Sequence, residues 1–216
     1  MAINKAKINE AAQKLSQQGK FKEAIAEYQK IIKGEPKDLN TLNTVGDLYV
    51  RLNNTAEAMQ YFIRLADIYV SDGFLVRGIA MYKKISKLDP ASTAANERLA
   101  ELYTMQGLFN EARAQYLQLA EAYLKNKKAP EAMNVLQKVL DLEPDNLQIQ
   151  QKLAELYRDH GQKDEAAAIY QRLADRLLQR EEVDEALKWL EKAAQLAPQN
   201  AEVVLLQAQI EQRRGQ

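Results

Sequence analysis

The sequence has no cysteine and only one histidine, His160, among its 216 residues. Without cysteine the chain cannot form a disulfide, a thiolate nucleophile or a Cys-ligated zinc site. Lys and Arg together equal Asp and Glu at 30 each, so no net positive charge is available to attract nucleic acid. No stretch approaches the ~18 consecutive apolar residues of a membrane span, and the first residues lack the apolar core of a signal peptide. We therefore expect a cytoplasmic protein that neither inserts into membranes nor binds nucleic acid.

Residues that could build a reaction centre are equally sparse. His160 directly precedes Gly161 at a predicted helix end, which favours a solvated turn residue over a catalytic base or metal ligand. Gly19 and Gly107 are isolated turn glycines and do not form a phosphate-binding loop. The carboxylates follow the spacing of a solvated helix face and show no metal-ligand pattern. We predict that the protein is not an enzyme and that it uses no cofactor and no metal ion.

A repeat with a period of roughly 54 residues covers nearly the whole chain, and a fixed period of this size indicates stacked structural units. Its clearest mark is a proline at this interval, and three full units, 37–90, 91–144 and 145–198, align between these prolines. Residues 5–36 match the end of the unit and 199–216 match its beginning. No linker or low-complexity tract interrupts the pattern, so we predict a single repeat domain over 1–216. The prolines are Pro36, Pro90, Pro144 and Pro198.

Each unit is expected to contain three helices, because apolar residues recur at three- and four-residue spacing and no strand pattern occurs. Helix ends are marked by Gly or Asn, which adopt the left-handed conformation readily, as at Gly73, Asn126 and Gly161. The predicted fold is all-α, an α-solenoid of about twelve antiparallel helices. Their expected ranges are 6–18, 21–34, 38–52, 55–70, 75–88, 92–106, 109–125, 129–142, 146–160, 163–179, 183–196 and 200–214.

A motif of two helices, about 34 residues long, lies within the larger unit. It places a small residue in the first helix, Tyr three residues later, Ala twelve residues after the small residue, and an aromatic residue four beyond that. Gly46, Tyr49, Ala58 and Phe62 show it, and the units at Ala100 and Ala154 repeat it. This pattern strongly resembles the tetratricopeptide repeat family, although tryptophan is absent from the start of the first helix.

The small residues of the motif are expected to lie where antiparallel helices pack closely. Nine of the ten tyrosines occupy motif positions, so we assign them to packing and not to a ligand cage. Seven first-helix positions, Ala12, Gly46, Ala66, Ala100, Ala120, Ala154 and Ala174, and seven second-helix positions, Ala24, Ala58, Gly78, Ala112, Ala132, Ala166 and Ala186, are all Ala or Gly.

Two registers of the motif overlap. The helices predicted at 55–70, 109–125 and 163–179 therefore each serve as the second helix of one pair and the first helix of the next. Such a helix needs apolar residues on two faces. Either equivalent helices alternate between the inner and outer layers of the solenoid, or the array departs locally from the standard superhelix.

The resemblance implies a concave groove, lined by the first helix of each pair, that holds a peptide or a helix of a partner protein. Six acids directly follow the small residues and would form a negative stripe that favours a basic or amphipathic partner over an acidic one. The alternative is that these acids are solvated and paired within their own helices, as Asp47 with Arg51. The candidate groove residues are Asn9, Gln13, Asn43, Asp47, Arg51, Asp67, Glu97, Glu101, Glu121, Gln151, Glu155 and Asp175.

Some relatives clamp acidic C-terminal peptides with groove Lys and Asn residues. Here the corresponding positions hold Asn43 with Asp47 in one unit and Glu97 with Glu101 in the next, and this departure argues against such a clamp. We predict a non-catalytic scaffold or adaptor for protein–protein interaction. Two alternatives stay open: a structural repeat protein that self-associates through its end helices, and a regulator that senses a peptide.

Overall fold

The computed structural model describes residues 4–214, and within this range it contains twelve helices and no strand, which confirms the predicted all-α solenoid fold. Every predicted boundary agrees with the structure to within one residue. The helices are α1 (Lys5–Gln17), α2 (Phe21–Gly34), α3 (Leu39–Arg51), α4 (Thr55–Ser71), α5 (Leu75–Leu88), α6 (Thr93–Met105), α7 (Phe109–Lys125), α8 (Ala129–Leu142), α9 (Leu147–Asp159), α10 (Lys163–Gln179), α11 (Val183–Leu196) and α12 (Ala201–Arg214).

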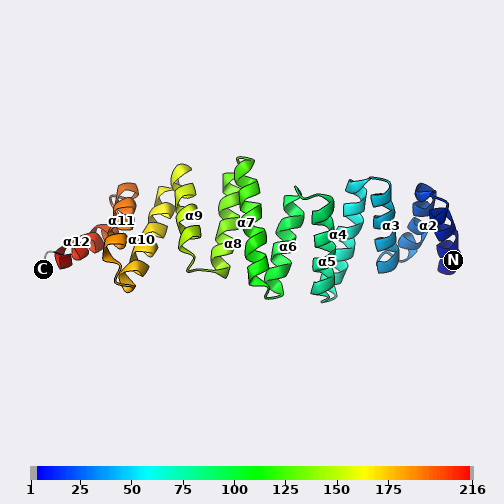
Figure 1. The fold of residues 1–216 in the computed structure, drawn as a ribbon, viewed down its shortest axis with the longest axis horizontal. Coiled ribbons are helices and arrows are strands. Elements are labelled where there is room, and N and C mark those ends of the chain that lie inside the picture. The colour runs from blue at the N-terminus through cyan, green and yellow to red at the C-terminus, as the bar shows by residue number, and fades with distance from the viewer. Residues whose placement is uncertain (1–3, 215–216) are drawn as a thin grey trace. The chain divides into compact units, whose positions relative to one another are not determined.

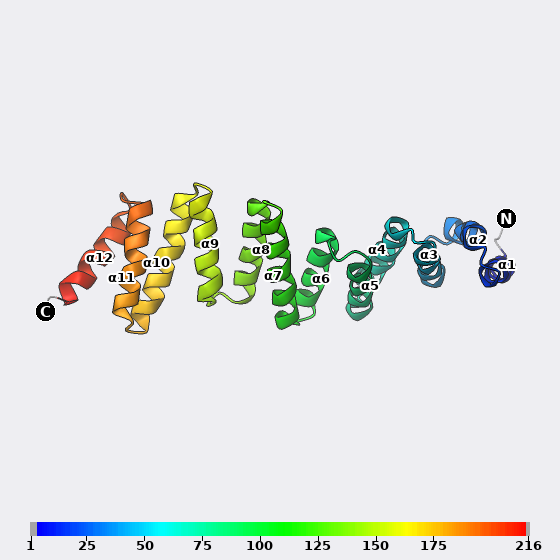
Figure 2. The same ribbon diagram turned by 45° about the horizontal axis from the view of Figure 1, so that its top comes forward.

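The chain forms two compact units, Met1–Gln115 and Tyr116–Gln216, and each is described by itself. In the first unit, α4 packs against both α3 and α5, and these three helices lie side by side in Figures 1 and 2. In the second unit, α10 packs in the same way against α9 and α11. The expectation that one helix serves two pairs is therefore confirmed for α4 and α10. The prediction of a single domain over 1–216 stays a prediction.

The third, sixth and ninth helices begin at equivalent positions of the repeat, and each begins with a side-chain cap. Asp38 Oδ1 accepts a hydrogen bond of 2.8 Å from Thr41 N–H, and Asn146 Oδ1 accepts one of 3.1 Å from Ile149 N–H. Ser92 Oγ caps α6 in the same way. These side chains satisfy backbone donors that the first helical turn cannot satisfy itself. This is why each helix starts one residue after the predicted residue.

Left-handed residues end the helices, also at equivalent repeat positions. Asn53, Gly107 and Gly161 have φ of 54°, 77° and 78°. α7 ends at Lys125, as predicted, but the left-handed conformation expected at Asn126 is found one residue later, at Lys127 with φ of 60°. Asn126 N–H still bonds to Ala122 O at 3.2 Å, so the left-handed residue follows the residue that makes the last such helical hydrogen bond.

Close packing at the small residues is confirmed. All twelve alanines of the motif expose 1% or less of their surface, and Gly46 and Gly78 are buried. A Cβ atom on Gly46 would lie 2.4 Å from Phe62 Cε1, and one on Gly78 would lie 2.6 Å from Val70 Cγ2. Contacts this short leave no room for a methyl group, so these two glycines set how closely their helices approach.

Candidate partner-binding site

Two of the predicted acidic residues meet in a polar cluster that joins α4, α5 and α6 of the first unit. Tyr82 Oη donates a hydrogen bond of 3.1 Å to Asp67 Oδ1, and Arg98 Nη1 donates one of 2.8 Å to Glu101 Oε2. Arg98 also acts on Tyr82, because its positive charge lowers the pKa of the Tyr82 hydroxyl. Asp67 and Glu101, which directly follow the small residues of two different motifs, are thus connected through one tyrosine and one arginine.

Tyr82 stays protonated in this cluster. The pKa of its hydroxyl is raised to about 12, first by burial and then by the negative charge of Asp67 and the hydrogen bond to it, against the opposing effect of Arg98. Burial disfavours the charged phenolate, and a neighbouring carboxylate adds repulsion. At neutral pH Tyr82 is therefore a neutral donor that orients the Asp67 carboxylate without cancelling its charge.

Asp47 belongs to a second cluster, in which it is paired across helices. Lys84 Nζ of α5 lies 2.5 Å from Asp47 Oδ1, and Asn43 Nδ2 donates a hydrogen bond of 3.2 Å to Asp47 Oδ2. The expected pair of Asp47 with Arg51 is not the one the structure forms, since Arg51 lies over the ring of Phe21, 5.6 Å from its centre. Because α3 and α5 both pack against α4, a cation of α5 reaches Asp47, and helix-face spacing could not indicate this contact.

An open pocket of about 670 Å³ runs along one face of α4 and reaches the α2–α3 turn. Half-buried Ile63 and Ile68 form its apolar wall, and exposed Asp67 adds a negative group. At the turn, Arg64 Nη2 donates a hydrogen bond of 2.5 Å to Pro36 O. The lining residues are Pro36, Lys37, Gln60, Ile63, Arg64, Asp67, Ile68 and Ser71. The pocket thus combines apolar surface with a carboxylate, within the first unit.

The other predicted groove residues are distributed over both units. In the second unit, Gln151 Nε2 donates a hydrogen bond of 2.9 Å to Glu155 Oε1 on α9, while exposed Glu121 lies on α7 and half-buried Asp175 on α10. In the first unit, Asn9 and Gln13 lie on α1 and half-buried Glu97 on α6. They lie on α1, α6, α7, α9 and α10, whereas Asp47 and Asp67 lie on α3 and α4.

Lysines at one repeat position were not among the predicted groove residues. Lys84, Lys138 and Lys192 occupy the same position of the three full repeat units, and each lies over the ring of an equivalent aromatic residue. The distance from Nζ to the ring centre is 3.9 Å for Phe62 and 5.7 Å for Tyr116 and for Tyr170. Their identical register is visible in the sequence and could have indicated a shared role. The sequence gives no such indication for Tyr82 and Arg98, because their roles depend on contacts between helices.

His160 lies at the end of α9, where it was expected, as an exposed C-cap whose Nδ1 is 2.9 Å from Leu156 O. Within residues 4–214, no group of three His, Asp or Glu residues is arranged to hold a metal ion. Over the same residues, no helix has both the length and the apolar character needed to cross a membrane.

Three sequence models of the family described as "Tetratricopeptide repeat" match this chain. One matches twice, at residues 9–72 and 63–123, and the other two match residues 123–182 and 167–200. "Tetratricopeptide repeat protein 21A" of Mus musculus is 26% identical over 186 residues, which are 84% of this chain and 14% of the length of that protein.

The similar solved structures include two that cover most of this chain. The C-terminal part of a TPR repeat-containing protein from Cytophaga hutchinsonii has 18% identity and a TM-score of 0.31, over 90% of this chain and 97% of that one. YrrB, described as "a TPR protein with an unusual peptide-binding site", has 17% identity and a TM-score of 0.28, over 84% of this chain and 97% of its own.

Proposed function

The chain belongs to the tetratricopeptide repeat family, and we propose that it is a scaffold that binds a basic or amphipathic segment of a partner protein. Proteins of this family generally mediate protein–protein interactions and are generally non-catalytic. The observation that carries the finer proposal is the pocket along α4, where apolar side chains and the Asp67 carboxylate line one cavity.

The pocket fits an amphipathic segment because its lining offers two kinds of contact. Ile63, Ile68 and the ring of Pro36 can cover apolar side chains of a partner, which is the main source of affinity in such sites. A lysine or arginine beside those side chains would meet Asp67. A charge-assisted hydrogen bond to a carboxylate is stronger than a neutral one and gives the contact direction.

Asp67 is the acid best placed for this role. In the first unit Asp47 is paired with Lys84 and Glu101 with Arg98, so each of those charges is already compensated. Asp67 accepts its hydrogen bond from the neutral hydroxyl of Tyr82, and no ion pair joins it to a cation of residues 4–214. The predicted stripe of six acids is therefore proposed to act mainly through Asp67, with Glu121, Glu155 and Asp175 as further candidates in the second unit.

Binding of two labelled helical peptides would test this function. One peptide carries Leu on one face and Arg beside it, and the other has Glu in place of every Arg. Fluorescence anisotropy should show that the Arg peptide binds and that D67K and I68A each weaken binding about tenfold or more, a loss of about 1.4 kcal/mol. The matched control is E191K, which reverses an exposed acid on α11.

The proposal predicts that D67K weakens binding of the Arg peptide and that E191K leaves it unchanged. Circular dichroism should show the same helicity for both variants, so that a change in affinity reflects the pocket and not the fold. Equal binding of the Arg and Glu peptides, or equal affinity of D67K and E191K, would contradict it.

A further inference from the structure

Five large apolar side chains are exposed at two turns of the first unit. Phe74 and Val76 lie at the α4–α5 turn with 51% and 65% of their surfaces exposed, and Met105, Leu108 and Phe109 lie at the α6–α7 turn with 59%, 36% and 54% exposed. Figures 1 and 2 both show these two turns at the same lower edge of the unit. We call these five residues the apolar edge. None of them lines the α4 pocket.

The repeat itself shows that the fold does not require apolar side chains here. At the equivalent positions of the neighbouring repeat units, the chain carries mostly charged or polar residues that fit the same turns. Phe74 corresponds to Lys128 and Glu182, Val76 to Pro130 and Asp184, Met105 to Arg51 and Asp159, Leu108 to Asn54 and Gln162, and Phe109 to Thr55 and Lys163. A cluster of exposed apolar residues that the architecture does not need marks an interaction surface.

One member of the apolar edge replaces a residue type that stabilises the fold. Asn54, the equivalent of Leu108, caps α4 by accepting a hydrogen bond of 3.3 Å from Glu57 N–H. A leucine side chain has no acceptor and cannot make that bond. Because such a cap stabilises a helix, Leu108 combines the loss of a favourable contact with exposure of apolar surface. That combination is expected of a residue whose contact lies outside the chain.

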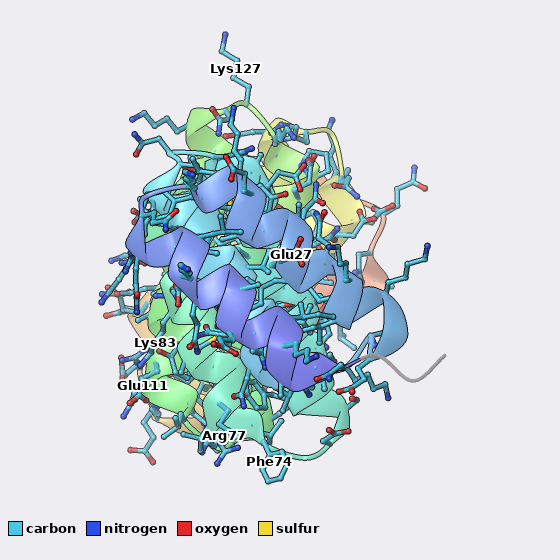
Figure 3. All side chains as sticks on the ribbon, turned by 90° about the vertical axis from the view of Figure 1, so that its right-hand side faces the viewer. Glu27, Phe74, Arg77, Lys83, Glu111 and Lys127 are labelled. Atoms are coloured by element: carbon cyan, nitrogen blue, oxygen red, sulfur yellow. The ribbon has the colours of Figure 1, made fainter. Side chains whose placement is uncertain are left out.

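The charges around the apolar edge point to the partner. Asp72, Arg77 and Glu111 are all exposed near it, and the guanidinium of Arg77 lies 5.1 Å from the centre of the Phe74 ring. Phe74, Arg77 and Glu111 all appear in the lower part of Figure 3. A partner whose charges all have one sign would leave either Arg77 or the two acids without an opposite charge. A second copy of the same surface, turned by a two-fold axis, presents acids to Arg77 and an arginine to the acids.

We propose that the apolar edge binds the apolar edge of a second copy of this chain. In this dimer, Phe74 and Phe109 form the apolar centre, and Arg77 of each copy faces Asp72 and Glu111 of the other. The contact places self-association at two turns of the first unit and not at the end helices. It is independent of the α4 pocket, so either site can fail without the other.

Sedimentation equilibrium of the full chain over a range of concentrations tests the dimer. The wild type should show a reversible dimer with a dissociation constant in the micromolar range, about −8 kcal/mol. The variant F74K/F109K installs the lysines that the chain itself has at 128 and 163, and it should be monomeric with unchanged helicity. The control Q162K/Q179K adds the same two charges at exposed turn positions of the second unit, and it should still dimerise.

A charge exchange tests the two-fold arrangement. R77E alone and D72R/E111R alone should each weaken dimerisation at least tenfold, whereas an equimolar mixture of the two should form a heterodimer as strong as the wild-type dimer. A wild type that is monomeric throughout the range, a dimer that F74K/F109K leaves intact, or a mixture no stronger than its components would overturn the proposal.

Discussion

Gly46 and Phe62 are matched in size, because the ring of Phe62 on α4 occupies the space that a side chain at position 46 of α3 would need. A Cβ at Gly46 would lie 2.4 Å from Phe62 Cε1 and 2.8 Å from Cζ. The equivalent positions hold Ala100 and Ala154, so the motif itself accepts alanine. The glycine is therefore a consequence of this particular neighbour and not of the repeat.

The first prediction follows from this match. G46A should lower the free energy of unfolding by ~1–3 kcal/mol, because the added methyl group must displace the Phe62 ring in a packed core. In the double variant G46A/F62L the two changes should partly compensate. Urea denaturation of the single and double variants forms a double-mutant cycle. Strictly additive effects would show that position 46 does not meet position 62.

A second prediction concerns alkaline pH and Tyr82. The pKa of Tyr82 is raised to about 12 in the folded chain, whereas an unfolded tyrosine titrates near 10. Below pH 10 Tyr82 is protonated in both the folded and the unfolded chain, and its full contribution to stability is present. Between pH 10 and 12 the unfolded state loses its proton first, so stability falls as the pH rises. At pH 11 the loss from Tyr82 should be about 1 kcal/mol.

Replacing Tyr82 isolates this effect from the titration of the other tyrosines. Y82F should cost ~1 kcal/mol at pH 7, since it removes the hydrogen bond to Asp67. Its further loss between pH 9 and pH 11 should be smaller than that of the wild type. Urea midpoints at the two pH values measure the difference, and parallel losses in both proteins would exclude Tyr82 as the cause.

A third prediction uses the repeat as its own control. Tyr170 is 1% exposed, and its hydroxyl finds no hydrogen-bond partner among residues 4–214, while the equivalent position in the first full unit is Phe62. Y170F should therefore leave stability unchanged or raise it by up to ~1 kcal/mol, because a buried hydroxyl without a partner is costly. The opposite result at Tyr82, whose hydroxyl is bonded, provides the contrast. A clear loss of thermal stability in Y170F would contradict this view of its hydroxyl.

A fourth prediction concerns left-handed backbone at one repeat position. Gly73, Lys127 and Glu181 are equivalent and have φ of 81°, 60° and 63°. Glycine adopts this conformation without the clash that a Cβ introduces, so E181G should stabilise the chain by roughly 0.5–1 kcal/mol. The variant E191G, at an exposed position inside α11, gains no such relief and should destabilise it, because glycine is unfavourable within a helix. Thermal unfolding of the two variants should shift in opposite directions, and a shift in the same direction would argue against strain at Glu181.

Features that depend on neighbours three or four residues away could be predicted from the sequence alone. The twelve helices and the burial of the small residues follow from local spacing and from the register of the repeat. The caps at Asp38, Ser92 and Asn146 are local as well, but the predicted ranges placed these residues inside their helices. A hydrogen bond from a cap side chain reaches only the next turn, and a buried helix face repeats with the helical period. Comparing one unit with the next made these signals stronger.

What the tertiary structure decided is which charged side chains meet. Asp47 pairs with Lys84, 37 residues away, and Asp67 meets Tyr82 across a helix boundary, although helical spacing had suggested Arg51 as the partner of Asp47. The sequence places these acids in one register, but their partners come from helices whose contact is set by the size of buried residues such as Gly46 and Phe62. A flexible acidic side chain on the surface pairs with whichever cation the helix packing brings near it. A sequence does not show how far apart two side chains from different helices lie.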